Sequence, residues 1–233
     1  MRRPCALNGA TEGEGAFMEN PQASVTASDS KTVIHTLAVR ITHWINAIAI
    51  IIMILSGWRI YDASPLFNFE FPASITLGSW LAGALQWHFA AMWLLVLNGV
   101  FYVCYGFISG HFKSSFLPLT WQSIWREFKS ALRGRISHEL GVYNAVQRAA
   151  YIGVLCLGVG LVLSGLSIWK PVQFQELAAL MGGYEGARWV HFVAMALTVF
   201  FILVHLTLVA LVPRTLWPMF SGRAAVHEKG EAK

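Results

Sequence analysis

The chain has 233 residues, of which 56% are hydrophobic and only 12% are charged. Soluble domains carry roughly a quarter charged residues, so this composition excludes an ordinary soluble fold and indicates one membrane-embedded domain. The net charge of +5 does not indicate nucleic-acid binding, because the basic residues lie between apolar runs and form no continuous patch.

The first 36 residues are polar and lack the apolar stretch of a secretory signal peptide. We expect residues 1–36 to form a disordered cytoplasmic tail. Cys5 lies in this tail, whereas Cys104 and Cys156 lie in apolar runs. No two cysteines have the spacing of a metal site, a redox motif or a covalent haem attachment.

Four apolar stretches are long enough to cross the hydrocarbon core of a bilayer, which takes about 20 helical residues. They cover about 37–60, 86–108, 147–169 and 188–212, and residues 76–85 can extend the second toward its N-terminus. Backbone groups in lipid must bond within the chain, so each stretch is expected to be an α-helix. The sequence therefore predicts an all-α, up-and-down, integral membrane four-helix bundle over 37–212.

The segment 116–135, between the second and third spans, mixes apolar and basic residues. Its apolar members are Trp121, Ile124, Trp125, Phe128 and Leu132. This spacing predicts an amphipathic helix on the cytoplasmic membrane surface, and the alternative is a partner-binding segment. Pro213 ends the fourth span, and 213–233 is expected to be a cytoplasmic tail. We find no internal sequence repeat along the chain.

Basic residues are concentrated at both ends of the chain and between the second and third spans. The other two loops carry fewer Lys and Arg, and these are balanced by Asp and Glu. The positive-inside rule then places both termini in the cytoplasm and these two loops in the periplasm. We expect a multi-pass protein of the bacterial inner membrane.

Four of the eight histidines lie within the predicted spans: His43, His88, His191 and His205. Ionisable residues are rare inside membranes and usually have a function there. His191 and His205 are fourteen residues apart, so they share one side of a helix and lie about 21 Å apart along it. One helix thus offers a ligand near each membrane surface.

The alternating direction of the spans gives each of these two histidines a partner. His43 and His205 are expected near the cytoplasmic side, and His88 and His191 near the periplasmic side. Paired imidazoles make haem iron six-coordinate, which favours electron transfer. The alternative is that the histidines stabilise helix contacts or relay protons. His35, His111, His138 and His227 lie outside the spans or at their ends, and we assign them no ligand role.

Two glycines fit the same arrangement. Gly57 follows His43 by fourteen residues, and Gly99 follows His88 by eleven, about 20° from its face. A residue without a side chain lets a flat macrocycle approach the helix closely. The alternative is packing between helices through small residues.

Several motifs are similar to those of a known family. They are Arg40-Ile-Thr-His43-Trp44, Gly57-Trp58, Gln86-Trp87-His88, the run Tyr143–Arg148, and the pair His191 and His205. With them, the chain from Val39 to Val212 resembles the di-haem cytochrome b subunits of nickel–iron hydrogenases, formate dehydrogenases and thiosulfate reductases. It looks most similar to members named thiosulfate reductase cytochrome b.

The resemblance implies that the four histidines bind two b-type haems in the pairing given above. It also implies a subunit that is not catalytic on its own and carries electrons between a periplasmic molybdopterin or hydrogenase-type oxidoreductase and membrane quinone. The long polar N-terminal tail departs from the hydrogenase pattern and leaves the partner open.

A quinone site beside the cytoplasmic haem is a further implication of the resemblance. Asn144 and Gln147 are then candidates to bond a quinone carbonyl, and Arg148 a quinone or a haem propionate. Alternatively, Asn144 caps the helix and Arg148 extends to the lipid headgroups. Arg40 precedes His43 by three residues and is a candidate for a propionate contact, or is an ordinary cytoplasmic basic residue.

Two other functions are compatible with the sequence. One is a stand-alone enzyme that oxidises superoxide and reduces quinone; the other is a haem-free, proton-coupled transporter. The aromatic loop 65–72 favours a docked partner over the first. The absence of a broken helix pair or inverted repeat in the sequence argues against the second.

Overall fold

The computed structural model describes residues 31–33, 35–110, 120–132 and 145–225. Four of its helices are long and apolar enough to cross a membrane: α1 (Leu37–Asp62), α2 (Leu81–Ile108), α5 (Ala145–Trp169) and α7 (Gly183–Leu211). The predicted all-α membrane bundle is confirmed. The helix α2 begins inside the extension over 76–85 that the sequence allows, and α7 begins at Gly183, five residues before the expected start at 188.

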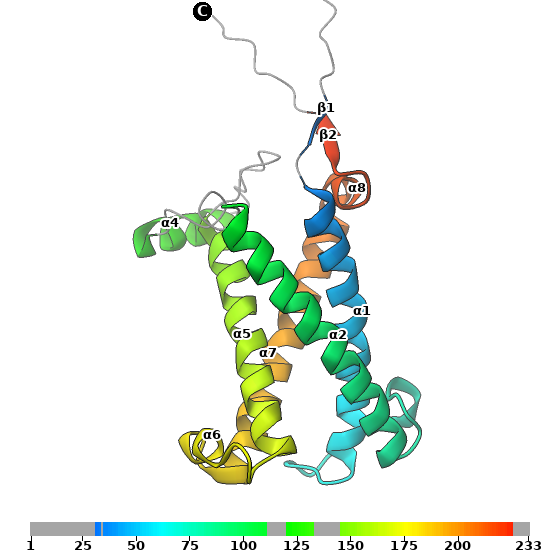
Figure 1. The fold of residues 1–233 in the computed structure, drawn as a ribbon. Coiled ribbons are helices and arrows are strands. Elements are labelled where there is room, and N and C mark those ends of the chain that lie inside the picture. Colours follow the sequence, from blue (N-terminus) through cyan, green and yellow to red (C-terminus); the bar gives the residue numbers. More distant parts are fainter. Residues whose placement is uncertain (1–30, 34, 111–119, 133–144, 226–233) are drawn as a thin grey trace, which may run out of the picture.

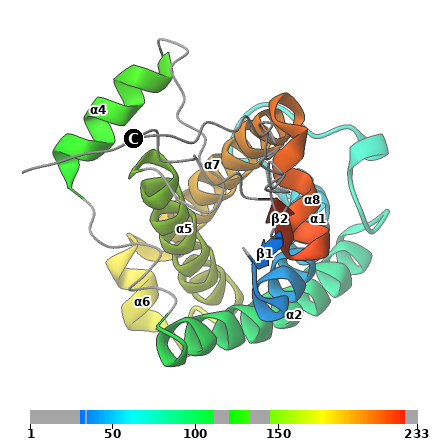
Figure 2. The same cartoon turned by 90° about the horizontal axis from the view of Figure 1, so that it is seen from above.

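The four long helices are arranged as two pairs. α1 packs along α2, and α5 packs along α7, whereas the backbones of the two pairs approach each other at few places. Figure 1 shows α2 crossing α1 obliquely, and Figure 2 shows the four helices standing around a common centre. The bundle is therefore built from two helical hairpins.

The buried residues within the described ranges are small. Apart from Pro218 in α8 and two glycines, the buried apolar residues are alanines, and the fully buried side chains with the largest volume are Ser56, Ser164 and Ser167. Small residues let helix backbones approach closely, which is how helices associate in lipid. Each hairpin is thus packed closely on alanine, serine and threonine.

The described chain begins and ends at the same end of the bundle, which we call the termini end (Figure 1). Here β1 (Lys31–Val33) pairs antiparallel with β2 (Arg223–Ala225). The helix η2 (Pro213–Thr215) and α8 (Leu216–Ser221) follow α7. These segments fall within the two predicted tails. The helix α4 (Trp121–Leu132) lies across this end, outside the bundle (Figure 2), where Glu127 accepts a hydrogen bond from the backbone N–H of Ala145.

The segment after α7 folds back over the start of α1. The indole of Trp44 stacks on Phe220 with ring centres 4.7 Å apart, and its Nε1 donates to the carbonyl of Met219 at 3.4 Å. The opposite end, which we call the loop end, carries η1 (Ala73–Ile75) in the first loop and α6 (Gln175–Leu180) in the second.

Candidate functional site

The structure brings the four histidines of the spans together as two pairs. Near the termini end, His43 of α1 faces His205 of α7 with ring centres 6.2 Å apart and ring planes at 61°. Near the loop end, His88 of α2 faces His191 of α7 at 6.4 Å and 60°. Each pair joins one hairpin to the other, because α7 supplies one histidine to both.

These separations fit a metal ion held between two imidazoles. Two imidazoles on opposite sides of one ion have ring centres about 6.3 Å apart, because each metal–nitrogen bond is about 2 Å long and each ring centre lies about 1.15 Å beyond its nitrogen. Directly packed aromatic rings also have centres about 4.5–7 Å apart, so the spacing is compatible with both arrangements. Both pairs are therefore far enough apart for one metal ion to be held between their rings.

A bare metal ion does not fit these positions. Within the described ranges, no group of three or more His, Cys, Asp or Glu side chains could hold a metal ion. Two imidazoles alone leave most of a metal's coordination positions unfilled. A planar macrocycle that brings its own four nitrogens, such as haem, completes the coordination.

At the loop end, each histidine has a serine partner on the neighbouring helix of its own hairpin. Ser56 Oγ lies 3.1 Å from His88 Nδ1, and Ser164 Oγ lies 3.0 Å from His191 Nδ1. The hydroxyl of Ser56 donates to Ile52 O at 2.6 Å, and that of Ser164 donates to Gly160 O at 2.6 Å. With its own proton on the carbonyl, each serine oxygen can accept from Nδ1–H, which would leave Nε2 unprotonated and able to bind a metal.

Glycines lie against the same two rings. A Cβ added at Gly57 would lie 3.4 Å from Cε1 of His88, and one added at Gly165 would lie 3.4 Å from Cε1 of His191. Gly57 was singled out from the sequence, and its contact in the structure is with the His88 ring. Gly165 was missed. A Cβ at Gly99 meets no described atom within 4 Å, so this glycine makes no such contact.

The remaining predicted site residues lie at the termini end or outside the described ranges. Arg40 is half-buried, and its Nε donates to Met219 O at 3.3 Å, which ties α1 to α8. Gln147 and Arg148 are half-buried on the first turn of α5. Asn144 falls outside the described residues.

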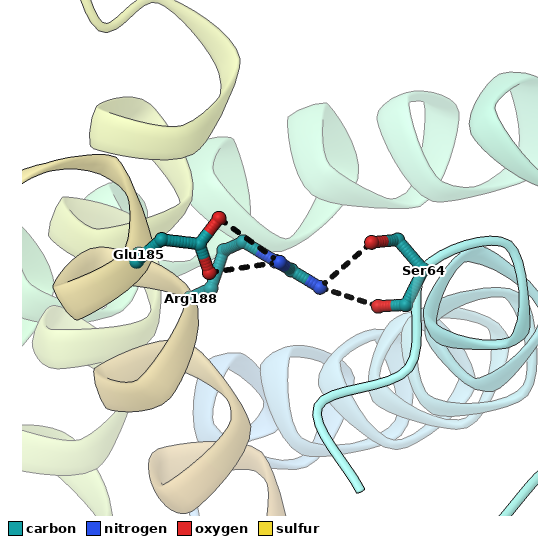
Figure 3. Close-up of polar contacts among 3 residues, drawn as sticks. All are labelled: Ser64, Glu185 and Arg188. Atoms are coloured by element: carbon teal, nitrogen blue, oxygen red, sulfur yellow. Dashed lines mark hydrogen bonds and ion pairs between the residues drawn. The ribbon is translucent and has the colours of Figure 1, made fainter. Parts of the chain in front are cut away.

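A polar contact links the two hairpins at the loop end (Figure 3). Arg188 of α7 donates to Glu185 at 2.9 and 3.2 Å and to Ser64 Oγ at 3.2 Å, and it also bonds the Ser64 carbonyl. Ser64 follows α1, so this guanidinium holds the start of α7 against the end of α1. His191 lies one helical turn further along α7.

Aromatic side chains make a second link beside His191. Phe192, the next residue in α7, contacts Tyr61 and Phe67 with ring centres 5.3 and 5.4 Å apart. Phe67 also meets Trp189 edge-on at 5.0 Å. Phe67 and Phe69 are 43% and 45% exposed. A partly exposed aromatic cluster therefore contacts the turn of α7 that carries His191.

The two hairpins share a short sequence pattern that the sequence analysis missed. Leu55-Ser56-Gly57 recurs as Leu163-Ser164-Gly165, and His88-Phe89-Ala-Ala-Met recurs as His191-Phe192-Val-Ala-Met. In each hairpin the serine contacts the histidine of the same hairpin. The serine and the histidine are 32 residues apart in one hairpin and 27 in the other, and this unequal spacing hides the repeat.

Comparison with known proteins identifies similar sequences over most of the chain. Residues 34–222 match the family model described as prokaryotic cytochrome b561. The chain is 52% identical over 190 residues to "Putative protein-methionine-sulfoxide reductase subunit YedZ1" of Azospira oryzae, which covers 81% of this chain and 96% of that protein.

Two more distant relatives are both named "Probable Ni/Fe-hydrogenase B-type cytochrome subunit". The one from Cupriavidus necator is 24% identical over 193 residues, 75% of this chain and 77% of that protein. The one from Bradyrhizobium diazoefficiens is 22% identical over 190 residues, 74% and 75% of the two chains. Hydrogenase subunits are among the classes that the motifs indicate, whereas a methionine-sulfoxide reductase subunit is not.

Proposed function

The chain belongs to the prokaryotic cytochrome b561 family, and from this premise we propose that it carries electrons through two b-type haems between a periplasmic oxidoreductase and membrane quinone. Family membership and the four spans make it a multi-pass membrane protein that binds haem b and serves electron transfer for an oxidoreductase. The haem count, the ligands, the partner's type and the quinone belong to the proposal.

We assign His43 and His205 to one haem and His88 and His191 to the other. The observation that carries this assignment is the spacing of the two pairs, 6.2 and 6.4 Å, each bridging the hairpins. When bound, haem with two imidazole ligands supplies a one-electron couple and leaves no open position for oxygen chemistry. The fourteen residues between His191 and His205 separate the two sites by about 21 Å, which is about two-thirds of the hydrocarbon core of a bilayer.

The loop end is proposed to face the periplasm and to receive the partner. The basic residues of α4 and of the termini end support an orientation with both termini in the cytoplasm of a bacterial inner membrane. The exposed rings of Phe67 and Phe69 beside His191 offer a docking surface close to one haem. The relative named as a methionine-sulfoxide reductase subunit supports a partner of the reductase kind, for which we propose a molybdopterin enzyme.

The quinone is proposed to bind at the termini end, near the first turn of α5. Gln147 and Arg148 lie there, half-buried, and their side chains can donate hydrogen bonds to a carbonyl oxygen. In this role they hold the quinone at the membrane depth of the His43–His205 pair.

Haem stoichiometry tests the proposal directly. The purified full-length protein should contain two b-type haems per chain in a pyridine haemochrome assay. His191→Ala and His205→Ala should each leave one haem, because each removes a ligand from a different site. His35→Ala is the matched control and should leave two, since His35 lies before α1 and outside both pairs. A chain that binds no haem, or one that keeps two haems in both variants, would refute the proposal.

A further inference from the structure

We propose that Ser56 and Ser164 are a matched pair of positioning residues that fix both imidazoles of the loop-end site in one tautomer and hold the potential of the haem there below the value it would otherwise have. This inference rests on the proposed function, because it assumes that His88 and His191 bind haem.

The contacts are the same on both sides of the site. Ser56 and Ser164 are each 0% exposed. Each hydroxyl donates a hydrogen bond, at 2.6 Å, to a carbonyl one turn earlier in its own helix. The oxygen of Ser56 also lies 3.1 Å from Nδ1 of His88, and that of Ser164 lies 3.0 Å from Nδ1 of His191. When the hydroxyl proton lies on the carbonyl, each ring would carry its proton on Nδ1 and direct Nε2 away from the serine.

A buried serine in a helix often bonds only the backbone of its own helix, and Ser167 of α5, the helix that carries Ser164, is such a case. Ser167 is also 0% exposed, and its hydroxyl donates to Leu163 O at 3.0 Å. No histidine contact is found for it among the described residues. Backbone bonding alone therefore does not explain why the other two hydroxyls both meet a histidine nitrogen.

The repeated pattern strengthens the inference. Leu-Ser-Gly occurs once in each hairpin, and in each the serine contacts Nδ1 of the histidine. The glycine that follows the serine lies against the same ring, because a Cβ added to it would be 3.4 Å from Cε1. Serine and glycine together contact one edge of the imidazole, and we call this Ser-Gly contact a seat for the ring. Two independent copies of this seat, one for His88 and one for His191, meet across a single site.

The other histidine pair lacks such seats. Within the described part of the chain, no side chain forms a hydrogen bond with His43 or His205. A hydrogen bond from Nδ1–H to an oxygen raises the electron donation of Nε2 and so stabilises the higher charge of a bound metal. Two such bonds at one site should stabilise oxidised iron at the loop end and leave the termini-end haem unaffected.

Redox titration of the purified full-length protein, followed through the haem absorption bands, tests the inference. Ser56→Ala and Ser164→Ala should each shift one of the two midpoint potentials upward. The shift corresponds to an increase of about threefold in the equilibrium constant for reduction of that haem. For a one-electron couple this is about 28 mV, from 59 mV per tenfold. The second midpoint should not move. Ser167→Ala is the matched control and should move neither, although it removes an equally buried hydroxyl.

A conservative variant separates the hydroxyl from the volume of the side chain. Ser164→Thr keeps an oxygen that can accept from Nδ1–H, so its potentials should stay near those of the unmodified protein. If the alanine variants instead lose the loop-end haem while Ser164→Thr and Ser167→Ala keep it, the positioning role is supported. Unmoved potentials in both alanine variants, or a threonine variant that behaves like alanine, would overturn the inference.

The same preparation distinguishes the two proposals. Fewer than two haems in the unmodified protein contradicts the proposed function. If the protein binds two haems and neither potential changes in the two alanine variants, only the role of the serines is contradicted.

Discussion

A hydrogen-bonded asparagine at the contact between α1 and α2 allows a quantitative test of the packing. Asn98 of α2 is 8% exposed, and its Nδ2 donates to Thr42 O at 2.8 Å and to Asn46 Oδ1 at 2.7 Å. Thr42 and Asn46 lie on either side of His43 in the sequence. The amide therefore holds α1 against α2 at the depth of the termini-end histidine pair.

The expected magnitude follows from these two bonds. Hydrogen bonds between membrane helices contribute about 0.6 kcal/mol on average and up to about 1.7 kcal/mol. Both distances are short and the amide is buried, so we expect about 1 kcal/mol for the bond between Asn46 and Asn98. In a double-mutant cycle of Asn46→Ala and Asn98→Ala, the coupling should be about 1 kcal/mol, a fivefold change in the unfolding equilibrium. The effect of alanine on helix propensity cancels in the cycle.

Reversible unfolding in mixed detergent micelles, followed by circular dichroism, measures each corner of the cycle. Asn98→Ala should be the more damaging single change, because it removes both bonds and Asn46→Ala removes one. A coupling below about 0.2 kcal/mol in variants that still fold would refute the reasoning, since it would mean that the amides gain as much from other partners.

Two further predictions concern the loop end. Gly165→Leu places a large side chain at a position where an added Cβ would already lie 3.4 Å from the His191 ring. Overpacking of about 1–3 kcal/mol should weaken haem binding at the loop end about 5- to 150-fold in a haem titration. Gly153→Leu is the control and should not weaken it, because a Cβ added there meets no described atom within 4 Å. An equal loss in both would argue against the contact. Arg188→Gln removes the bonds to Ser64 and Glu185 and should lower the free energy of unfolding by no more than about 1 kcal/mol, because Glu185 is exposed to solvent.

The sequence predicts the spans and the histidine pairing for a physical reason. Length and hydropathy decide what crosses a bilayer, and the fourteen-residue spacing of His191 and His205 fixes two depths on one helix. The start of α7 is less predictable, because Gly183 begins this helix in residues that hydropathy alone assigns to a loop. The fold of 213–221 depends on a long-range contact of Trp44 with Phe220, which no local pattern reveals.

The serine contacts could not be predicted from one sequence. A serine in an apolar helix ordinarily bonds the carbonyl one turn before it, and both Ser56 and Ser164 do so. Their second contact depends on how two helices of a hairpin cross. The recurrence of Leu-Ser-Gly and of the His-Phe pattern was the available signal, and it becomes readable only once the hairpins are recognised as equivalent.

The composition of the interior connects the fold to the cofactor. Each hairpin is held by close packing of small residues, and within the described ranges the hairpins are joined mainly by the Arg188 contact, the aromatic rings near Phe67, and the two histidine pairs. A group bound only by the folded protein stabilises it through mass action. Because each pair draws one histidine from α7 and one from the other hairpin, a haem bound at either site would add a further connection between the hairpins. Haem binding at these sites should therefore strengthen the association of the two halves.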